Sequence, residues 1–196
     1  MNLRELKRSR TRQALVDAAY ELFAAKGFEA TTIAEIAARA EVGTRTFFSY
    51  FPTKEDVLFP ASDARVRIAL AAIAGREPGE EPASVLLRAL REAGEANDDM
   101  TGPLAAMRTK LTMSVPSVRG RALQLQWEAQ EEIARHLAAA YPGELDEIGA
   151  AALVGAFVGA VNGALMTLLR DPARRGDQAA VQRATDVALR PWSARP

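Results

Sequence analysis

The sequence predicts an all-α protein of about nine helices. Apolar residues recur every three or four positions along nearly the whole chain, and no segment of useful length shows the alternation of a half-buried strand. Glycine, proline and acidic clusters divide this pattern into separate helical segments. With 196 residues, of which 48% are hydrophobic, the chain is long enough for one or two domains with a buried core.

Three helical segments are expected near the N-terminus. The first carries an apolar face between Thr11 and Lys26. A capping box, in which Thr32 is followed three residues later by Glu35, opens the second. The third spans Thr44–Phe51 and follows a three-residue turn. Three helices with such a turn between the last two describe a helix-turn-helix unit, whose final helix enters the DNA major groove.

The remaining helices are expected in one continuous series. A fourth helix begins at Thr53 and runs to about Ile73. Loops rich in proline, glycine or acidic residues separate the others. Those helices are expected at residues 84–96, 104–113, 118–140, 145–170 and 177–189.

The composition limits the chemistry of the chain. There is no cysteine, which excludes disulfides, thiolate metal sites and cysteine nucleophiles. His136 is the only histidine, so sites that need two histidines are excluded and a Ser-His-Asp triad would have to include it. No carboxylate pair or nucleophile can be placed in a common site, so we expect no enzyme, metal or cofactor. No secretory leader opens the chain, and we expect a cytoplasmic protein.

Two features make the N-terminal helices a candidate DNA-binding unit rather than a packing module. Charges balance overall, with 25 basic and 25 acidic residues, yet the first twelve residues carry five basic side chains and one acidic one. The third helix is polar at its start, where base contacts would lie. There Arg45 can pair bidentately with guanine, and the side chains of Thr44, Thr46 and Ser49 can reach phosphates or a thymine methyl.

A known pattern is formed by two segments, Gly27–Ala37 and Pro52–Leu58, and by Val42, Thr46 and Phe51 between them. Together these residues resemble the DNA-binding domain of the TetR family of transcriptional regulators. The resemblance implies a homodimeric repressor whose third helices bind the two halves of a palindromic double-stranded DNA operator. It also implies that a small-molecule effector in a larger domain releases the DNA. We therefore expect a DNA-binding domain at 9–69, with its helix-turn-helix at 32–51, and a ligand-binding and dimerisation domain at 70–196.

The resemblance also assigns candidate DNA contacts. Thr32 and Lys54 begin helices at positions that the family uses for phosphates, where free amides and a positive charge attract anions. The basic N-terminal arm is expected to add phosphate or minor-groove affinity. The candidate DNA-binding residues are Arg8, Arg10, Arg12, Thr32, Thr44, Arg45, Thr46, Phe47, Ser49, Tyr50 and Lys54.

Several residues depart from the family pattern. Glu41 replaces a common turn glycine, and a left-handed conformation there would cost about 1 to 2 kcal/mol. Gly43 replaces a capping serine, and Arg45 a small residue. Phe48 replaces a tyrosine and Tyr50 a histidine. Because Phe48 has no hydroxyl for a phosphate, that role passes to Tyr50 or is lost.

The segment Gly149–Leu169 contains only two polar residues, one of them Asn162, and has the length of a membrane span. Its many small residues and the central asparagine favour a buried helix instead. In the family the last two long helices form the dimer interface, so we expect 145–170 and 177–189 to pair with their copies. Close approach of a neighbouring backbone is permitted by a stripe of glycines. These glycines are Gly155, Gly159 and Gly163.

Bulky apolar residues and an occasional hydrogen-bonding one also suit a mostly apolar ligand pocket, although each can equally belong to the core. The candidate lining residues are Phe59, Met107, Leu111, Leu123, Trp127, Phe157 and Asn162. The segments Phe47–Phe51 and Arg121–Glu128 resemble a TetR subgroup that includes mycofactocin-type regulators, which suggests a long-chain acyl thioester as effector. The alternative is a constitutive DNA-binding dimer without an effector.

Overall fold

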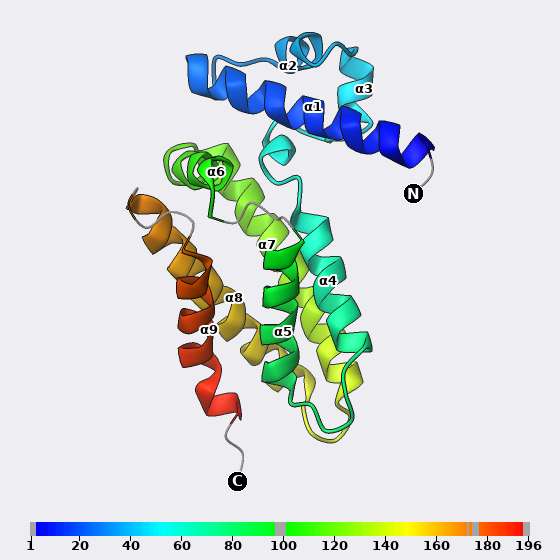
Figure 1. Cartoon of the computed structure of the whole chain (residues 1–196), viewed down its shortest axis with the longest axis vertical. Helices are drawn as coiled ribbons and strands as arrows, with labels where there is room; N and C mark the ends of the chain where they lie inside the picture. Colours follow the sequence, from blue (N-terminus) through cyan, green and yellow to red (C-terminus); the bar gives the residue numbers. More distant parts are fainter. Residues whose placement is uncertain (1–2, 97–100, 172, 174–176, 194–196) are drawn as a thin grey trace.

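The regular structure is helical throughout the part of the chain that the computed structural model describes, residues 3–96, 101–171, 173 and 177–193. This confirms the predicted fold class. Figure 1 shows a head at one end of an elongated body. The head (residues 3–58) contains α1 (Leu3–Lys26), α2 (Ile33–Arg39), α3 (Thr44–Phe48) and a 3-10 helix, η1 (Glu55–Leu58). The body (residues 62–193) contains α4 (Ser62–Ala74), α5 (Pro82–Glu95), α6 (Pro103–Ser114), α7 (Pro116–Ala140), α8 (Glu147–Arg170) and α9 (Gln178–Ser193).

Three element boundaries in the head differ from the sequence expectation. α1 begins at Leu3, so the basic N-terminal segment is helical and not an extended arm. α3 ends at Phe48, and the next residues form a turn in which the Tyr50 N–H donates to the Phe47 carbonyl at 2.9 Å. The expected continuous fourth helix is split into η1 and α4 at Pro60, which has no N–H to continue the helical hydrogen bonds.

The helix-turn-helix itself is built by local capping. At the start of α2 the Glu35 N–H donates to the Thr32 hydroxyl at 3.2 Å, and the Thr32 N–H donates to the Glu35 carboxylate at 2.9 Å. At the end of α2 the Val42 N–H reaches the Ala37 carbonyl at 2.9 Å, as in a Schellman motif. That motif places Glu41 in the left-handed region, at φ +57°. A residue with a side chain pays about 1 to 2 kcal/mol for this conformation.

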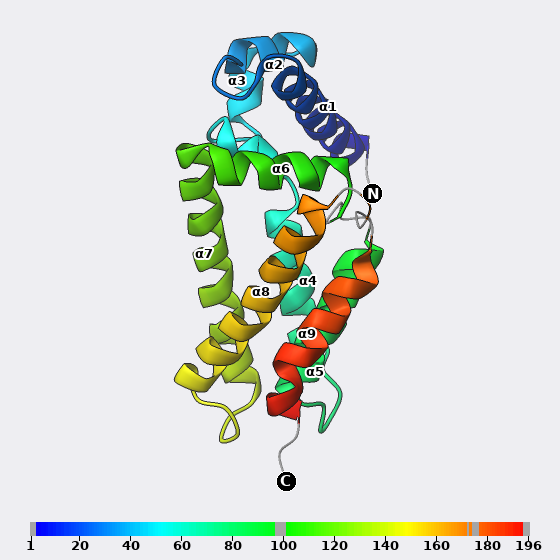
Figure 2. The ribbon, with the colours of Figure 1, turned by 90° about the vertical axis from the view of Figure 1, so that its left-hand side faces the viewer.

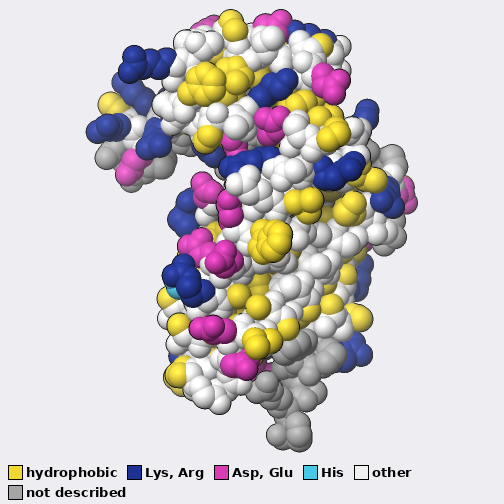
Figure 3. Space-filling view, turned by 180° about the vertical axis from the view of Figure 1, so that it is seen from behind, with side chains coloured by type: hydrophobic (Ala, Val, Ile, Leu, Met, Phe, Trp, Pro, Cys, Tyr) yellow, Lys and Arg dark blue, Asp and Glu magenta, His cyan; other side chains and the backbone are white. Residues whose placement is uncertain are grey.

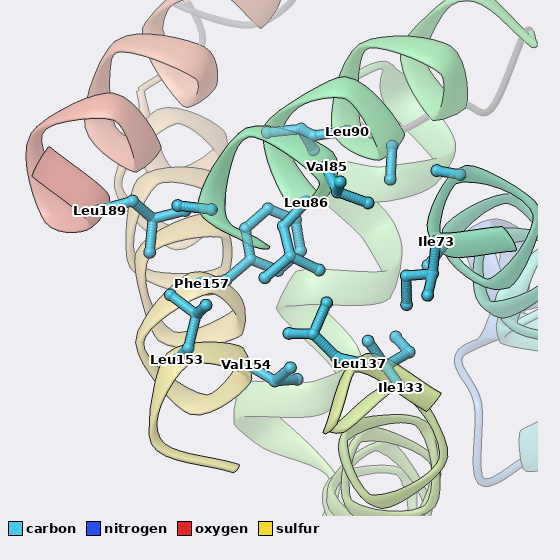
Figure 4. Close-up of a cluster of buried hydrophobic side chains, with 14 of the residues drawn as sticks. Ile73, Val85, Leu86, Leu90, Ile133, Leu137, Leu153, Val154, Phe157 and Leu189 are labelled. Carbon is cyan, nitrogen blue, oxygen red and sulfur yellow. The ribbon is translucent and has the colours of Figure 1, made fainter. Parts of the chain in front are cut away.

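The head and the body have separate hydrophobic cores. Leu15, Ile36 and Phe51 are among the fully buried residues of the head. In the body, Leu86 of α5, Leu137 of α7 and Leu153 of α8 meet in a second cluster, drawn in Figure 4. The α4 residues Ala69 and Ile73 belong to this second cluster. We therefore propose moving the boundary of the DNA-binding domain from residue 69 to the connection between η1 and α4.

The head rests on α6 and the start of α7. Figure 2 shows α6 lying across the end of the body, next to the head. Half-buried Met107 and Leu111 of α6 pack against the head core, and Val118 of α7 is completely buried in it. Across the same junction, Arg121 Nε of α7 donates to Asp56 Oδ1 of η1 at 2.7 Å. The junction between head and body is thus formed by α6 and α7.

The apolar segment expected as a buried helix is α8. Among the described residues it is the one helix long and apolar enough to cross a membrane by length and composition. Its inner side supplies Leu153, Val154 and Phe157 to the body core. Only 22% of its most apolar stretch is buried within the protomer, so the expectation of a buried helix holds for this inner side and not for the rest of α8.

Candidate nucleic-acid interface

The outer face of α3 combines polar and aromatic side chains. Thr44, Arg45 and Ser49 are exposed, and Phe48 is 54% exposed. Phe47 points the opposite way and is fully buried, with its ring centre 5.7 Å from that of Phe51. The assignment of Phe47 as a groove-facing residue is therefore wrong. It shares the inner face of the turn with Phe51, four residues later, so Phe48 faces outward instead.

The basic start of α1 brings one arginine beside the segment that follows α3. Arg8 and Arg10 are exposed, and the Arg8 guanidinium lies 5.9 Å from the centre of the Tyr50 ring. Figure 3 shows dark-blue side chains gathered on the overhanging end of the head, which the first turns of α1 form. Positive charge therefore lies beside the residues that follow α3, where it can attract phosphate groups.

Arg12, a third predicted contact, is held inside the head. Its guanidinium donates to the Tyr50 carbonyl at 3.2 Å and to the Pro60 carbonyl at 3.0 Å. It also lies 4.5 Å from the centre of the Phe51 ring. Burial lowers the pKa of Arg12. The side chain therefore joins α1 to the segments on both sides of η1.

Lys54 is similarly engaged. Its ammonium donates to the Phe28 and Thr31 carbonyls, each at 2.8 Å, and lies 4.3 Å from the centre of the Phe28 ring. These bonds tie the start of η1 to the loop before α2. Because an ammonium has three N–H groups, one remains for a phosphate.

The hydroxyl groups are also partly used within the head. The Thr32 hydroxyl donates to Glu35 at 2.8 Å, and the Ser49 hydroxyl donates to the Thr46 carbonyl at 2.7 Å. Glu35 also accepts from Lys26 Nζ at 2.5 Å, and this hydrogen bond is the largest cause that lowers the pKa of Glu35 to about 2. Thr44 is exposed and Thr46 is half-buried.

The seven predicted pocket residues do not come together. Phe59, Met107 and Leu111 pack against the head core, whereas Phe157 belongs to the body core. Asn162 Nδ2 of α8 donates to Gln126 Oε1 of α7 at 2.8 Å. The remaining two lie on the outside of α7 and cannot line an enclosed pocket in this conformation. They are Leu123, 56% exposed, and Trp127, 76% exposed.

The three predicted interface glycines lie in open space among the described residues of the protomer. A Cβ atom added to any of them would meet nothing within 4 Å. Within the described part of the protomer, the stripe therefore does not serve helix packing. Those glycines are Gly155, Gly159 and Gly163.

Two features of the site were missed by sequence reasoning. The exposure of Phe48 was not readable from the sequence, because the five residues of α3 are too few for helical periodicity to separate its two sides. The pairing of Asp56 with Arg121 left no signal, because 65 residues separate the partners. Within the described part of the chain, no three histidine or acidic side chains gather as a metal site would require.

Comparisons with known proteins support the interpretation of the head as a DNA-binding domain. Residues 15–60 match the profile of bacterial regulatory proteins of the tetR family. The HTH-type transcriptional regulator TcmR of Streptomyces glaucescens is 35% identical over 150 residues, which cover 74% of this chain. The chain belongs to the TetR family. TetR proteins are DNA-binding transcriptional regulators, not enzymes. The aligned region spans 66% of the length of TcmR.

Solved TetR structures share the fold along nearly the whole chain. The Thermus thermophilus FadR complex with lauroyl-CoA is 23% identical, with a TM-score of 0.56 and coverage of 94% of this chain and 96% of that one. A TetR regulator from Rhodococcus sp. RHA1 is 22% identical, with a TM-score of 0.55 and coverage of 96% and 97%. At these identities the likeness concerns the fold alone.

Proposed function

We propose that this TetR-family chain is a cytoplasmic, homodimeric repressor that binds a palindromic operator through α3 and does not associate with a membrane. The observation that carries the proposal is the exposed outer face of α3, with exposed Arg8 beside the turn that follows it, in a helix-turn-helix whose α2 is capped. Arg45 reads a base edge, since its fork of donors matches guanine. Arg8, Arg10 and the free N–H of Lys54 contact phosphates, which supply affinity that does not depend on sequence.

We also propose that five polar residues of the head contact the DNA backbone or base edges. They are Thr32, Thr44, Thr46, Ser49 and Tyr50. For Thr32 and Ser49, the hydroxyl protons are already donated within the head, so a DNA contact requires their rotation or their use as acceptors. Arg12 has another role in this proposal. Because both of its terminal nitrogens bind backbone carbonyls, it holds α1 against the segment that follows α3.

The proposed dimer forms through the outer faces of α8 and α9. On α8 the open glycine stripe lies in the same helix as exposed Ile148 and Met166, and on α9 Val187 is exposed. Figure 3 shows a broad uncharged area on the body, with apolar side chains in yellow and charged side chains along its margin. Large apolar side chains left in water favour association with a second copy. Trp127 and Leu123 on neighbouring α7 are exposed and can extend this interface.

The proposed effector is a largely apolar molecule of the long-chain acyl thioester class. The subgroup resemblance supports this class, and the lauroyl-CoA complex of T. thermophilus FadR provides a first compound to test. Release requires that the effector bind the DNA-incompetent arrangement more tightly than the competent one. An effector that shifts α6 or the start of α7 would tilt the head, because Met107 and Val118 pack directly on the head core.

A constitutive DNA-binding dimer is the second candidate. It is favoured by the packing of the predicted pocket residues, since Met107 and Leu111 support the head and Phe157 fills the body core. Isothermal titration with acyl-coenzyme A thioesters of increasing length separates the two candidates. Heat of binding together with release of operator DNA supports an effector-controlled repressor. Absence of both, in protein that still binds its operator, supports the constitutive dimer.

The primary function is tested by selection from randomised duplexes at fixed salt. We expect enrichment of a symmetric site. Arg45→Ala should relax the base preference at one position of each half-site, whereas Lys54→Ala should weaken all sequences uniformly and lower the salt slope by about one. Arg91→Ala, on the exposed surface of α5 in the body, is the matched control and should change neither. A folded, dimeric protein that enriches no site would contradict the proposal.

A further inference from the structure

Phe48 is a large apolar group on an otherwise polar surface of α3. Its side chain is 54% exposed. Thr44 and Arg45, which precede it by four and three residues, are exposed on the same side of the helix. Phe48 therefore lies among the residues that the proposed function turns towards the major groove. Leaving such a ring in water is unfavourable, and burial against an apolar group is favourable.

The ring is held in one place by the core beneath it. Phe47 and Phe48 meet edge to face, with ring centres 5.7 Å apart and planes at 88°. Phe47 is fully buried and packs against Phe51, so the supporting ring is itself fixed. An anchored aromatic side chain loses little conformational freedom when it binds a partner.

The chemistry of the ring restricts what it can recognise in DNA. A phenyl group has no hydrogen-bond donor and cannot hold a phosphate. The major groove offers one strongly apolar feature, the 5-methyl group of thymine, and side chains such as phenylalanine make apolar contacts with it. Arg45, one helical turn away, is suited to the polar edge of guanine.

We propose that Phe48 is a specificity-determining residue that contacts a thymine 5-methyl group in each operator half-site. This inference rests on the proposed function, because it requires α3 to enter the major groove. It adds an apolar base contact to the guanine contact proposed for Arg45. The selected operator therefore contains a thymine close to the base pair read by Arg45, on both sides of its centre.

Deoxyuridine provides the test, since it differs from thymidine in DNA only by the missing methyl group. In the operator obtained by selection, each half-site thymine is replaced in turn by deoxyuridine, symmetrically in both half-sites. Affinity is measured at fixed salt by fluorescence anisotropy. Burial of one methyl group corresponds to about a fourfold change in affinity, so loss of both methyl groups should weaken the wild-type protein about 15-fold.

The protein variants isolate the ring from other effects. Phe48→Ala should bind the thymine operator and its deoxyuridine form equally, because the contact is already gone. Arg45→Ala should keep the difference between the two duplexes, although its overall affinity is lower. Phe48→Leu retains an apolar group and should keep part of the difference. Thermal unfolding by circular dichroism checks that all three variants are folded.

Several results would overturn the inference. One is a wild-type affinity that no deoxyuridine substitution lowers. Another is a substitution that lowers the affinity of wild type and Phe48→Ala by the same factor, which would mean that another residue reads the methyl group. A uniform loss for Phe48→Ala on every sequence would assign the ring to the sugar-phosphate backbone. Failure of the wild-type protein to select any site would refute the proposed function itself, and this inference with it.

Discussion

The ion pair between Asp56 and Arg121 should make a measurable contribution to the stability of the junction between head and body. Arg121 Nε lies 2.7 Å from Asp56 Oδ1, and the side chains are 24% and 8% exposed, respectively. Arg121→Met keeps most of the aliphatic length and removes the guanidinium. The Asp56 carboxylate then stays largely buried without its cation, and we expect the free energy of unfolding to fall.

The magnitude follows from the partners that remain. Removing one member of a fully buried ion pair costs about 3 to 5 kcal/mol. Here Arg121 is partly hydrated, and the other carboxylate oxygen of Asp56 keeps hydrogen bonds from the Thr53 N–H at 2.8 Å and the Thr53 hydroxyl at 2.7 Å. We therefore expect a loss of about 2 kcal/mol for Arg121→Met. The double variant Arg121→Met/Asp56→Asn should lose about 1 to 2 kcal/mol less free energy of unfolding than the two single variants lose together, because the same interaction is removed only once.

Urea unfolding followed by far-ultraviolet circular dichroism measures these differences. The protein concentration must be the same in every experiment, because the stability of a dimer depends on concentration. Arg135→Met, at an exposed position further along α7, is the matched control and should change the stability by less than about 0.5 kcal/mol. The reasoning is refuted if Arg121→Met costs no more than this control, or if the two single effects add within about 0.3 kcal/mol.

Three further predictions concern the turn after α2, the capping box of α2 and the proposed dimer interface on α8. Glu41→Gly should raise the free energy of unfolding by about 1 kcal/mol, because glycine relieves the strain at φ +57°. Part of the gain is lost because glycine has more conformational freedom in the unfolded state. A lower free energy of unfolding in urea would contradict this prediction. The pKa of Glu35 lies near 2 instead of 4.5, mainly because the carboxylate accepts a hydrogen bond from Lys26, so its contribution is present above pH 4.5 and is lost as the pH falls towards 2. Thermal melts should show this loss, and Glu35→Gln should reduce the pH dependence in that window. Gly159→Arg should give a folded monomer in sedimentation experiments, because the site is open within the protomer, whereas Ala24→Arg, at an exposed position of α1, should stay dimeric.

Local sequence patterns account for much of the head. The capping box of Thr32 and Glu35 and the turn at Glu41 depend on residues within a few positions of one another, and the structure contains both. Helical periodicity also predicted the long helices of the body to within a few residues at most ends. In such segments the apolar spacing repeats over several turns, so it identifies the helix without knowledge of its neighbours.

Side-chain roles that depend on distant residues were not predictable in the same way. Arg12 and Lys54 are basic residues in a DNA-binding family, yet carbonyls 23 to 48 residues away in sequence bind their donors. Trp127 looks like a pocket residue by type but lies on the surface. Composition does not tell which side of a helix faces its neighbours when apolar residues occur on several sides.

The sequence by itself determined the helical class, the helix-turn-helix and the family, because these follow from spacing, capping and motif residues that lie close together in the chain. Only the tertiary structure decided that Phe47 is buried and Phe48 exposed, that α6 and α7 support the head, and that the glycines of α8 face outward. α3 has five residues, too few for periodicity to distinguish its two sides. The packing of the rest of the head against it makes that choice.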